Sequence, residues 1–406
     1  MRGSTLAERA RETDRRGARG RVLYVVPTSF RLEHHLDGQL AHLVDRGFDV
    51  EVACQFDDRS RRAAGREGVP LTPIDLRPEV RPLRDIVSLW TLGRRLFRGR
   101  IDVVNCSTKK GGLYGTILGR VLGRSATVYI VYGIDRTSPG PLKGAFFACI
   151  EWATCHLADR VVFLSRSTRD SFLDRGLCPP DRAVILSGGS SNGVNTDRFQ
   201  CSASLSHQGT EFRRGLGIPA RGFVIGFVGR LTRQKGVEEL REAWRVAAAR
   251  SEDLHLLLLA PPEVDPAVSN AVEEMLRHSR VHMVGFLRDP RVAYAAMDLL
   301  ILPSHDQTEG LPNVILEASS MEVPILATRV AGCRDAVLEG RTGVLVEPRN
   351  AGALADAVVA VSRDGEKARR MGTLGRAWCL ENFRQERIWE DYVCLYDDLV
   401  GTGSPR

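Results

Sequence analysis

The chain has 406 residues, which is too long for one ordinary core, so its length predicts two domains. Its composition of 43% hydrophobic and 26% charged residues is typical of a globular α/β protein and excludes a low-complexity or repetitive chain. The formal net charge of +7 fits an arginine-rich surface, an anionic membrane face or a phosphorylated ligand, whereas no aromatic-interleaved basic platform or zinc spacing indicates nucleic acid.

The beginning of the chain, residues 1–20, is basic and is predicted to be disordered, and no apolar run follows it that could form a signal peptide. The longest apolar runs, "LHLLLLA" and "MDLLILP", have the length of strands, so no membrane span is predicted. Nine scattered cysteines without a C-x-x-C pair indicate reduced thiols in a cytoplasmic protein. The histidines are dispersed, so we expect no metal.

The first half predicts a parallel sheet. The β-branched run "RVLYVVP" (21–27) is followed by a helix-period segment that ends at Gly47 and leads into a second strand. "IDVVNCS", "ATVYIVYG" and "RVVFLS" supply further buried strands. We therefore expect a first doubly wound domain over residues 21–205.

The pattern restarts after a polar, glycine-bearing stretch (199–220), which reads as a linker. Five strands separated by helical segments then predict a second doubly wound domain over residues 206–385. We expect residues 386–406 to form a helix that packs back on the first domain. Two such domains create a crevice between the carboxyl ends of both sheets, where open α/β sheets bind ligands.

The stretch "GFVGRLTRQKGVEEL" predicts a strand, a glycine loop and a helix. Gly229 forms the loop, while Arg230 and Lys235 flank it just before the helix begins. Unpaired N–H groups at a helix N-terminus favour an anion, and two cations beside them make a pocket for a diphosphate. A surface pair flanking an ordinary loop is the alternative.

The stretch "EGLPNVILE" (309–317) places two glutamates around a short helix. Pro312 suits a first helical position, and Glu317 then lies five residues into the helix, about 7.5 Å along its axis. A phosphate at the helix start would leave Glu317 to accept the ribose hydroxyls and Glu309 to meet what lies beyond the phosphates. The backbone that would hold the diphosphate is supplied by Gly310, Leu311, Pro312 and Asn313.

These stretches together resemble the retaining glycosyltransferases of the GT-B fold, family GT4, in which a "GRL…KG" loop and an E-x7-E helix clamp a nucleotide sugar. "VAGCRDAVLEGRTGVLVEPRN" (330–350) is similar to the loop and strand that follow in that family. Three further stretches, "RPLRDIVSLWTLGRRLFRGRIDVVNCSTKKGGLYG" (81–115), "GGSSNGVNTDRF" (188–199) and "ENFRQERIWEDYVCLYDDL" (381–399), are similar, more loosely, to the branch of that family that extends sugars on undecaprenyl diphosphate. The resemblance implies metal-independent transfer, with Glu309, Arg230 and Lys235 as catalytic residues.

The first half departs from that family at three positions. Asn105 and Ser107 stand where such relatives carry histidines, and Tyr132 replaces the histidine expected against the donor sugar. A tyrosine can still donate a hydrogen bond to a sugar hydroxyl. These replacements leave a non-catalytic nucleotide-binding scaffold open as an alternative.

For the acceptor side, the candidates are basic residues near strand ends. His34 and His35 are expected in the first loop after the first strand, where they are candidates for acceptor contact or proton removal, or else for capping or packing. Lys109 and Lys110, beside a glycine pair, are candidates for an acceptor diphosphate. Asn192 and Gly193 read as a tight turn near the hinge.

The sequence thus predicts a retaining transferase that moves a sugar, most simply from a UDP-sugar, to a polyprenyl-diphosphate-linked or oligosaccharide acceptor in bacterial surface polysaccharide synthesis. A nucleotide-sugar epimerase or a sugar-phosphate synthase of the same fold is the alternative. The helical spacing of apolar residues in 142–160 and the positive charge also raise peripheral contact with an anionic membrane, although such spacing more often belongs to a plain core helix.

Overall fold

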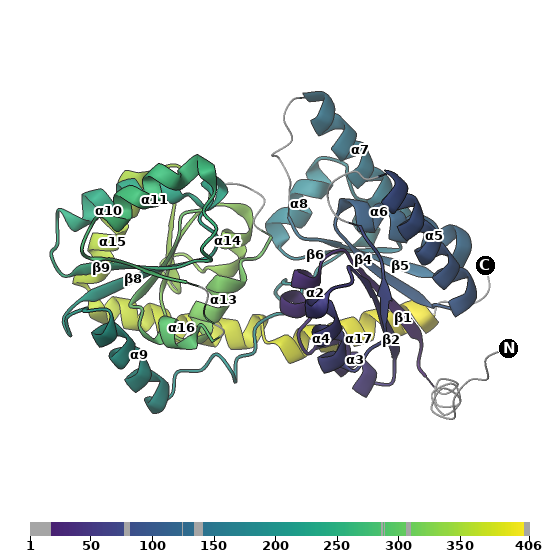
Figure 1. Ribbon diagram of the computed structural model, residues 1–406, viewed down its shortest axis with the longest axis horizontal. Coiled ribbons are helices and arrows are strands. Elements are labelled where there is room, and N and C mark those ends of the chain that lie inside the picture. The colour runs from purple at the N-terminus through teal and green to yellow at the C-terminus, as the bar shows by residue number, and fades with distance from the viewer. Residues whose placement is uncertain are drawn as a thin grey trace.

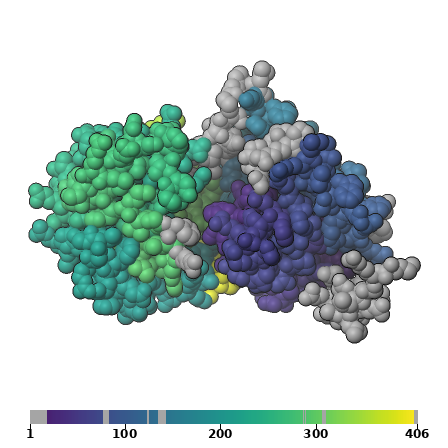
Figure 2. Space-filling model, in the orientation of Figure 1, coloured from purple at the N-terminus to yellow at the C-terminus, as the bar shows by residue number. Residues whose placement is uncertain are grey.

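The computed structural model describes residues 18–76, 82–123, 125–133, 141–285, 287, 289–305 and 310–401. The chain forms two lobes, each built on a parallel sheet with helices on both faces (Figure 1). This confirms the predicted pair of doubly wound α/β domains. Figure 2 shows the surface hollowed between the two lobes.

The first lobe contains a seven-stranded sheet in the order β3-β2-β1-β4-β5-β6-β7, in which every neighbouring pair is parallel. Its strands are β1 (Arg21–Val26), β2 (Asp49–Cys54), β3 (Leu71–Pro73), β4 (Val103–Ser107), β5 (Ala126–Val131), β6 (Arg160–Phe163) and β7 (Ala183–Val184). The chain order reverses beside β1, so the carboxyl ends of β1 and β4 open at the switch point where such sheets bind ligands.

Two separate groups of helices cover this sheet. One face packs against α2 (Ser29–His35), α3 (Gln39–Asp45), α4 (Asp58–Glu67) and α17 (Gln385–Gly401). The other face packs against α5 (Pro82–Gly99), α6 (Lys109–Leu118), its π-helical extension η2 (Gly119–Gly123), α7 (Pro141–Leu157) and α8 (Arg166–Asp174). Alternating strand residues feed the two cores, as Val22 and Leu23 show by lying on opposite faces.

The second lobe contains a six-stranded parallel sheet in the order β10-β9-β8-β11-β12-β13. Its strands are β8 (Phe223–Val228), β9 (Leu254–Leu259), β10 (Val281–Val284), β11 (Leu299–Leu302), β12 (Ile325–Thr328) and β13 (Gly343–Val346). One face carries α10 (Val237–Ala248), α11 (Ser269–Leu276) and α15 (Ala351–Arg363). The other carries α9 (Ala203–Gly215), α12 (Arg291–Ala295), α13 (Asn313–Ser320), α14 (Ala331–Ala336) and α16 (Gly365–Asn382).

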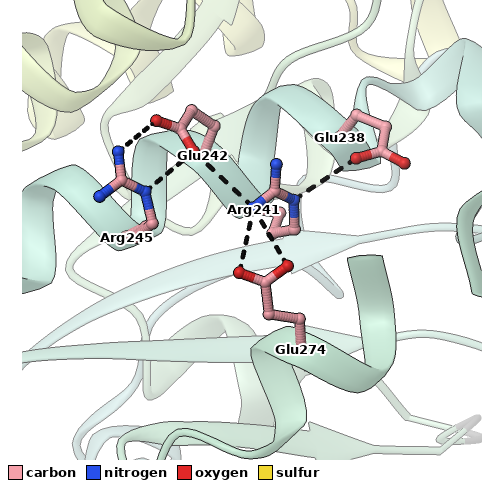
Figure 3. A network of polar contacts seen from close by, with 5 residues as sticks. All are labelled: Glu238, Arg241, Glu242, Arg245 and Glu274. Atoms are coloured by element: carbon pink, nitrogen blue, oxygen red, sulfur yellow. Dashed lines mark hydrogen bonds and ion pairs between the residues drawn. The ribbon is translucent and has the colours of Figure 1, made fainter. Parts of the chain in front are cut away.

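Ion pairs join α10 to α11 on the outer surface of the second lobe (Figure 3). Arg241 contacts Glu274 of α11 at 3.1 Å and Glu238 of its own helix at 3.4 Å. Arg245 pairs with Glu242 at 2.6 Å. Exposed pairs of this kind contribute little stability each, so the network fixes the alignment of the two helices more than it holds the fold.

The stretch read as a linker (199–220) contains a helix, which corrects the sequence interpretation. Ser202 caps α9 by accepting a hydrogen bond from the Leu205 amide, and Leu205 is buried. Gly209 lies against the backbone of Ala295, where an added Cβ would approach the carbonyl oxygen to 2.6 Å. The polar composition misled the prediction because only this narrow face of α9 packs on α12.

The chain crosses between the lobes twice, and the two crossings pair with each other. The amide of Val194 donates to the carbonyl of Phe383 at 2.9 Å, and the amide of Gln385 donates back to Val194 at 3.2 Å. Gly193 has φ +67°, and a Cβ there would lie 2.4 Å from the Phe383 oxygen. Asn192 accepts a hydrogen bond from the Trp389 indole at 2.6 Å. The Asn192–Gly193 turn thus lies at the junction of the lobes.

Beyond the second crossing, α17 packs on the first lobe. A hydrogen bond joins Nε2 of His42 in α3 to Oε1 of Glu390 at 2.8 Å, and Asp397 forms an ion pair with Arg19. Ile388, Tyr392 and Tyr396 are buried in the core beneath the first sheet. The last helix of the described chain therefore completes the domain with which the chain begins.

Candidate active site

Two loops of the second lobe lie against each other at the carboxyl edge of its sheet. One follows β8 (229–236) and the other follows β11 (303–312). Gly236 has φ +72°, and an added Cβ would lie 2.0 Å from the carbonyl oxygen of Pro303. The amide of His305 also donates to the carbonyl of Gln234 at 3.3 Å. Only glycine permits this approach, which joins the two loops that the sequence singled out.

The first loop presents the predicted cations beside open backbone. Gly229 has φ +142°, and nothing lies within 4 Å of a Cβ built on it, so the backbone there is accessible. Arg230 is exposed, and Lys235 is half-buried at the end of the single turn η4 (Arg233–Lys235). A ligand lying over this loop can therefore approach both the main chain and a guanidinium group.

The start of α13 is better suited to an anion than the start of α10. The first turn of α10 carries the carboxylates Glu238 and Glu239, which complement the positive end of that helix. The first turn of α13 carries no acidic residue, and none of the described side chains caps it. The N–H groups at such a helix start suit phosphate oxygens. The charge at the two helix starts therefore favours α13 over α10 as a candidate anion site.

Pro312 is the N-cap of α13 and Asn313 is its first residue, one position later than the sequence suggested. Leu311 is buried in the core shared with the sheet. Gly310 and Pro312 are buried as well, and Asn313 is half-buried. Glu309 lies outside the described residues.

Glu317 is the fifth residue of α13, and its carboxylate is positioned by a hydrogen bond from Tyr294 of α12. The Tyr294 hydroxyl donates to Oε2 of Glu317 at 2.7 Å. Burial raises the pKa of Glu317 to about 7, although the Tyr294 hydrogen bond and the charge of Arg198 oppose this shift. The sequence analysis missed Tyr294, because nothing in the pattern of α12 distinguishes it from a core aromatic residue.

The two lobes touch where Gly310 meets Tyr132. A Cβ on Gly310 would lie 1.8 Å from the Tyr132 carbonyl oxygen, so the loop before α13 passes directly over the end of β5. The Arg31 guanidinium lies over the Tyr132 ring, 3.9 Å from its centroid, and His35 approaches the same ring edge-on at 5.5 Å. The structure thus brings Tyr132 to the second-lobe loops and adds Arg31, which the sequence analysis did not consider.

His34 and His35 lie on the helix α2 and not in a loop, and they face different surroundings. His34 is 39% exposed, 3.5 Å from Glu33, and burial lowers its pKa moderately. His35 packs on Tyr132, and burial together with the Arg31 charge lowers its pKa to about 4. His35 is therefore neutral at physiological pH, and it is the nearer of the two histidines to the lobe contact.

The two candidate lysines of α6 already have contacts within the first lobe. Lys110 donates to Asp85 of α5 at 2.7 Å, and the two side chains are 15% and 8% exposed. The ammonium of Lys109 lies 4.3 Å from the centre of the Phe147 ring. In this structure Lys110 fastens α5 to α6, which gives it a structural role apart from the predicted acceptor contact.

Asn105 and Ser107 are both buried within the first lobe. The Asn105 amide donates to the hydroxyl of Tyr396 in α17 at 2.6 Å. Asn105 therefore joins β4 to the last helix, and the position expected to carry a histidine serves packing here.

Among residues 18–401 that the structure describes, no group of three or more His, Cys, Asp or Glu side chains is placed to hold a metal ion. In the same residues, no helix combines the length and apolar character needed to cross a bilayer.

Each of the two lobes matches the profile of a known protein family. The profile described as "Glycosyl transferase 4-like domain" matches residues 32–189, and that described as "Glycosyl transferases group 1" matches residues 222–364. The first match covers most of the first lobe. The second includes both candidate loops and α13.

Individual relatives agree with this assignment. The chain is 25% identical over 364 residues to the capsular polysaccharide biosynthesis glycosyltransferase CapM of Staphylococcus aureus, covering 89% of this chain and 93% of that protein. It is 29% identical over 264 residues to the alpha-maltose-1-phosphate synthase of Mycolicibacterium smegmatis, covering 61% and 65% of the two chains.

A solved structure of Anabaena HepE in complex with UDP has the same fold, with a TM-score of 0.77 at 20% identity, covering 93% of this chain and 100% of that one. Its likeness extends over both lobes. The family profiles, the relatives and this fold together identify the chain as a glycosyltransferase of the GT-B fold, with a glycosyltransferase 4-like first domain and a group 1 second domain.

Proposed function

We propose that this glycosyltransferase binds a UDP-sugar between the loop 229–236 and the start of α13, and transfers the sugar with retention of anomeric configuration. The observation that carries the proposal is the acid-free N-terminus of α13, which ends the loop whose first residues, Pro303 and His305, meet Gly236 and Gln234, with Glu317 about one turn into the helix. The uridine base is supported by the HepE structure, which contains UDP.

In this proposal the diphosphate occupies the start of α13. Arg230, Lys235 and the backbone N–H groups of Gly310, Leu311 and Asn313 balance the negative charge that develops as the bond to the sugar breaks, so no metal is required. Glu317 accepts the ribose hydroxyls, and Tyr294 keeps its carboxylate in position. The family resemblance implies that Glu309 orients the donor sugar. It also implies that the acceptor oxygen attacks the anomeric carbon from the same face that the diphosphate leaves, and that the leaving phosphate takes the acceptor proton.

The acceptor side is the first lobe, at the carboxyl ends of β1, β4 and β5. Arg31, Tyr132 and His35 lie there opposite Gly310. We propose a polyprenyl-diphosphate-linked or oligosaccharide acceptor of a bacterial surface polysaccharide, handled by a cytoplasmic enzyme at the inner membrane face. Support comes from the relationship to CapM, whose name places it in capsular polysaccharide biosynthesis.

A sugar phosphate is a second candidate acceptor, and a specific likeness favours it. The relative from Mycolicibacterium smegmatis is an alpha-maltose-1-phosphate synthase, and 61% of this chain aligns with it. The cationic Arg31 beside Tyr132 would suit a phosphate on either kind of acceptor, so product analysis with both acceptors distinguishes them.

Donor binding is the first test, measured by thermal unfolding with UDP-, GDP- and ADP-sugars. A ligand at 100 times its dissociation constant stabilises by about 2.7 kcal/mol, which raises Tm by roughly 2–4 °C for a domain of this size. We expect a shift for a UDP-sugar that is undiminished by a metal chelator and lost in Glu317→Ala and Lys235→Ala.

The matched control is Lys367→Ala, which removes the same charge from an exposed position on α16. It should keep the full shift. If no nucleotide sugar stabilises the wild-type protein, the proposed donor site is wrong; a shift that survives Glu317→Ala would remove Glu317 from it.

A further inference from the structure

The helix α5 exposes an apolar face that nothing in the described chain covers. Its core side buries Leu92 and Leu96, whereas large apolar side chains recur every three or four residues on the opposite side. These residues and their exposed fractions are Leu83 82%, Ile86 62%, Val87 63%, Trp90 63% and Phe97 75%. Single exposed apolar residues are normal, but a contiguous stripe of this kind marks a contact surface.

The apolar surface continues onto the neighbouring elements. Figure 1 shows α5, α6 and α7 next to one another on the same side of the first sheet. Leu122 of η2 lies 3.2 Å from where a Cβ on Gly93 would stand, and its neighbour Val121 is 71% exposed. On α7, Phe146 is 62% exposed and Trp152 49%. The helix 142–160, considered from sequence as a membrane contact, is thus the margin of a surface centred on α5.

The charge around this surface is mainly positive. Residues 82–123 contain eight basic and two acidic residues. Of the acids, Asp85 is buried against Lys110, and Asp102 precedes β4, where it accepts from the Arg21 amide. Arg94 and Arg98 are exposed among the apolar residues, and the Arg94 guanidinium lies 5.3 Å from the centre of the Trp90 ring. At the start of α5, Arg84 pairs with Asp75 at 3.1 Å, so the charges that stand among the apolar side chains further along the helix are those of Arg94 and Arg98.

We infer that this surface, defined by Leu83, Ile86, Val87, Trp90, Phe97 and Val121 with Arg94 and Arg98, lies on an anionic lipid bilayer. An amphipathic helix of this kind inserts its apolar face at the headgroup boundary while its arginines bind anionic headgroups. A second copy of the chain fits less well, because a symmetric contact would bring the same arginines together.

The inference rests on the proposed function, and it positions the bilayer relative to the acceptor side of the first lobe. As the crossover between β3 and β4, α5 runs from the carboxyl edge of the first sheet to its amino edge. Its first turn is fastened to the start of α6 by the pair Asp85–Lys110. The apolar face consequently begins at the same edge as the acceptor side, so a lipid-linked diphosphate could reach Arg31 and Tyr132 while its polyprenyl chain stays in the bilayer.

The test is co-sedimentation of the full chain with vesicles of phosphatidylcholine alone and of phosphatidylcholine with phosphatidylglycerol. We expect binding to the anionic vesicles that weakens as salt shortens the Debye length. The variants Trp90→Ser/Phe97→Ser and Arg94→Glu/Arg98→Glu should each weaken binding at least about tenfold. Matched controls are Leu276→Ser/Leu380→Ser and Arg369→Glu/Arg370→Glu, which alter exposed residues of the second lobe and should bind as the wild type does.

Donor-induced thermal stabilisation, measured on the same variants, separates this inference from the proposed function. It should be unchanged in all of them, which also verifies folding. Absence of vesicle binding by the wild type, or equal binding by variants and controls, would overturn the inference even if UDP-sugar binding is intact. Loss of a wild-type dimer in the α5 variants, with no vesicle binding, would instead identify the face as a contact between copies.

Discussion

Asn105 donates a hydrogen bond to Tyr396 at 2.6 Å, and Tyr396 donates onward to Tyr24 at 2.8 Å. All three side chains are buried, and they join β4, α17 and β1. The chain of hydrogen bonds therefore ties the last helix to the centre of the first sheet.

Tyr396→Phe should lower stability without changing donor affinity. The substitution leaves the buried Asn105 amide without its acceptor, at a cost of about 1–3 kcal/mol. Urea unfolding would measure the loss, and UDP-sugar titration would show that the second lobe is intact. Tyr114→Phe, on α6 and outside this chain of hydrogen bonds, is the matched control. An unchanged unfolding midpoint for Tyr396→Phe would show that the link is not stabilising.

Glu317→Gln should stabilise the ligand-free protein in a pH-dependent way. Because burial raises the pKa of Glu317 to about 7, the folded state holds its proton more tightly than the unfolded state does. Stability is therefore lost as pH rises from the unfolded pKa toward the folded one. The Tm difference between the variant and the wild type should be smallest below about pH 4, grow as pH rises through the window between the two pKa values, and level off above about pH 7.

Glutamine can still accept the hydrogen bond from Tyr294, so this variant removes the charge and keeps the contact. Glu366→Gln, exposed in the first turn of α16, should show no such pH dependence. If the difference for Glu317→Gln is flat across this range, the carboxylate is better solvated than its burial indicates.

Gly310→Ala should impair turnover more than stability. The added methyl group would overlap the Tyr132 carbonyl, 1.8 Å away, and must displace one lobe from the other. Misplacement of the reacting groups on this scale should reduce kcat/KM by at least about tenfold. Small-angle X-ray scattering of the variant should report a more open molecule. Gly365→Ala, where nothing lies within 4 Å of the added Cβ, should behave as the wild type does.

Lys110→Met should destabilise the first lobe, because it removes the ammonium group that pairs with the buried Asp85 carboxylate. Removing one member of a buried pair costs about 3 kcal/mol or more, whereas replacing both with apolar residues costs less. We therefore expect Lys110→Met/Asp85→Leu to be more stable than either single variant in urea unfolding. If Lys110→Met instead leaves stability intact and raises KM for the acceptor, Lys110 has the acceptor role first predicted for it.

The sequence predicted the fold because the strands are continuous apolar runs whose order alternates with helices. It identified the two loops of the second lobe through Gly229, Lys235 and the spacing of the glutamates, which are local features. The short edge strands β3 and β7 were not predicted, because segments of three and two residues are too short to show a periodic pattern. The linker interpretation failed for a related reason, because α9 buries only a narrow face.

Contacts between side chains that lie far apart in the sequence could not be predicted. Tyr294 meets Glu317 and Arg31 meets Tyr132 only because separate elements pack together. Lys110 looked available beside its glycine pair until α5 brought Asp85 against it. The exposed face of α5 was likewise hidden, because its periodicity alone cannot say which side of the helix turns inward.

The position of α17 also determines the order in which the protein can be completed. The first lobe leaves the ribosome well before the second, yet the groove that receives Ile388, Tyr392 and Tyr396 stays empty until α17 has been translated. The nascent first lobe therefore exposes apolar surface until α17 has been made, and exposed surface of this kind is what chaperones bind. For the same reason, a fragment ending between the lobes would lack part of its own core, and the two halves cannot be produced as independent domains by a single cut.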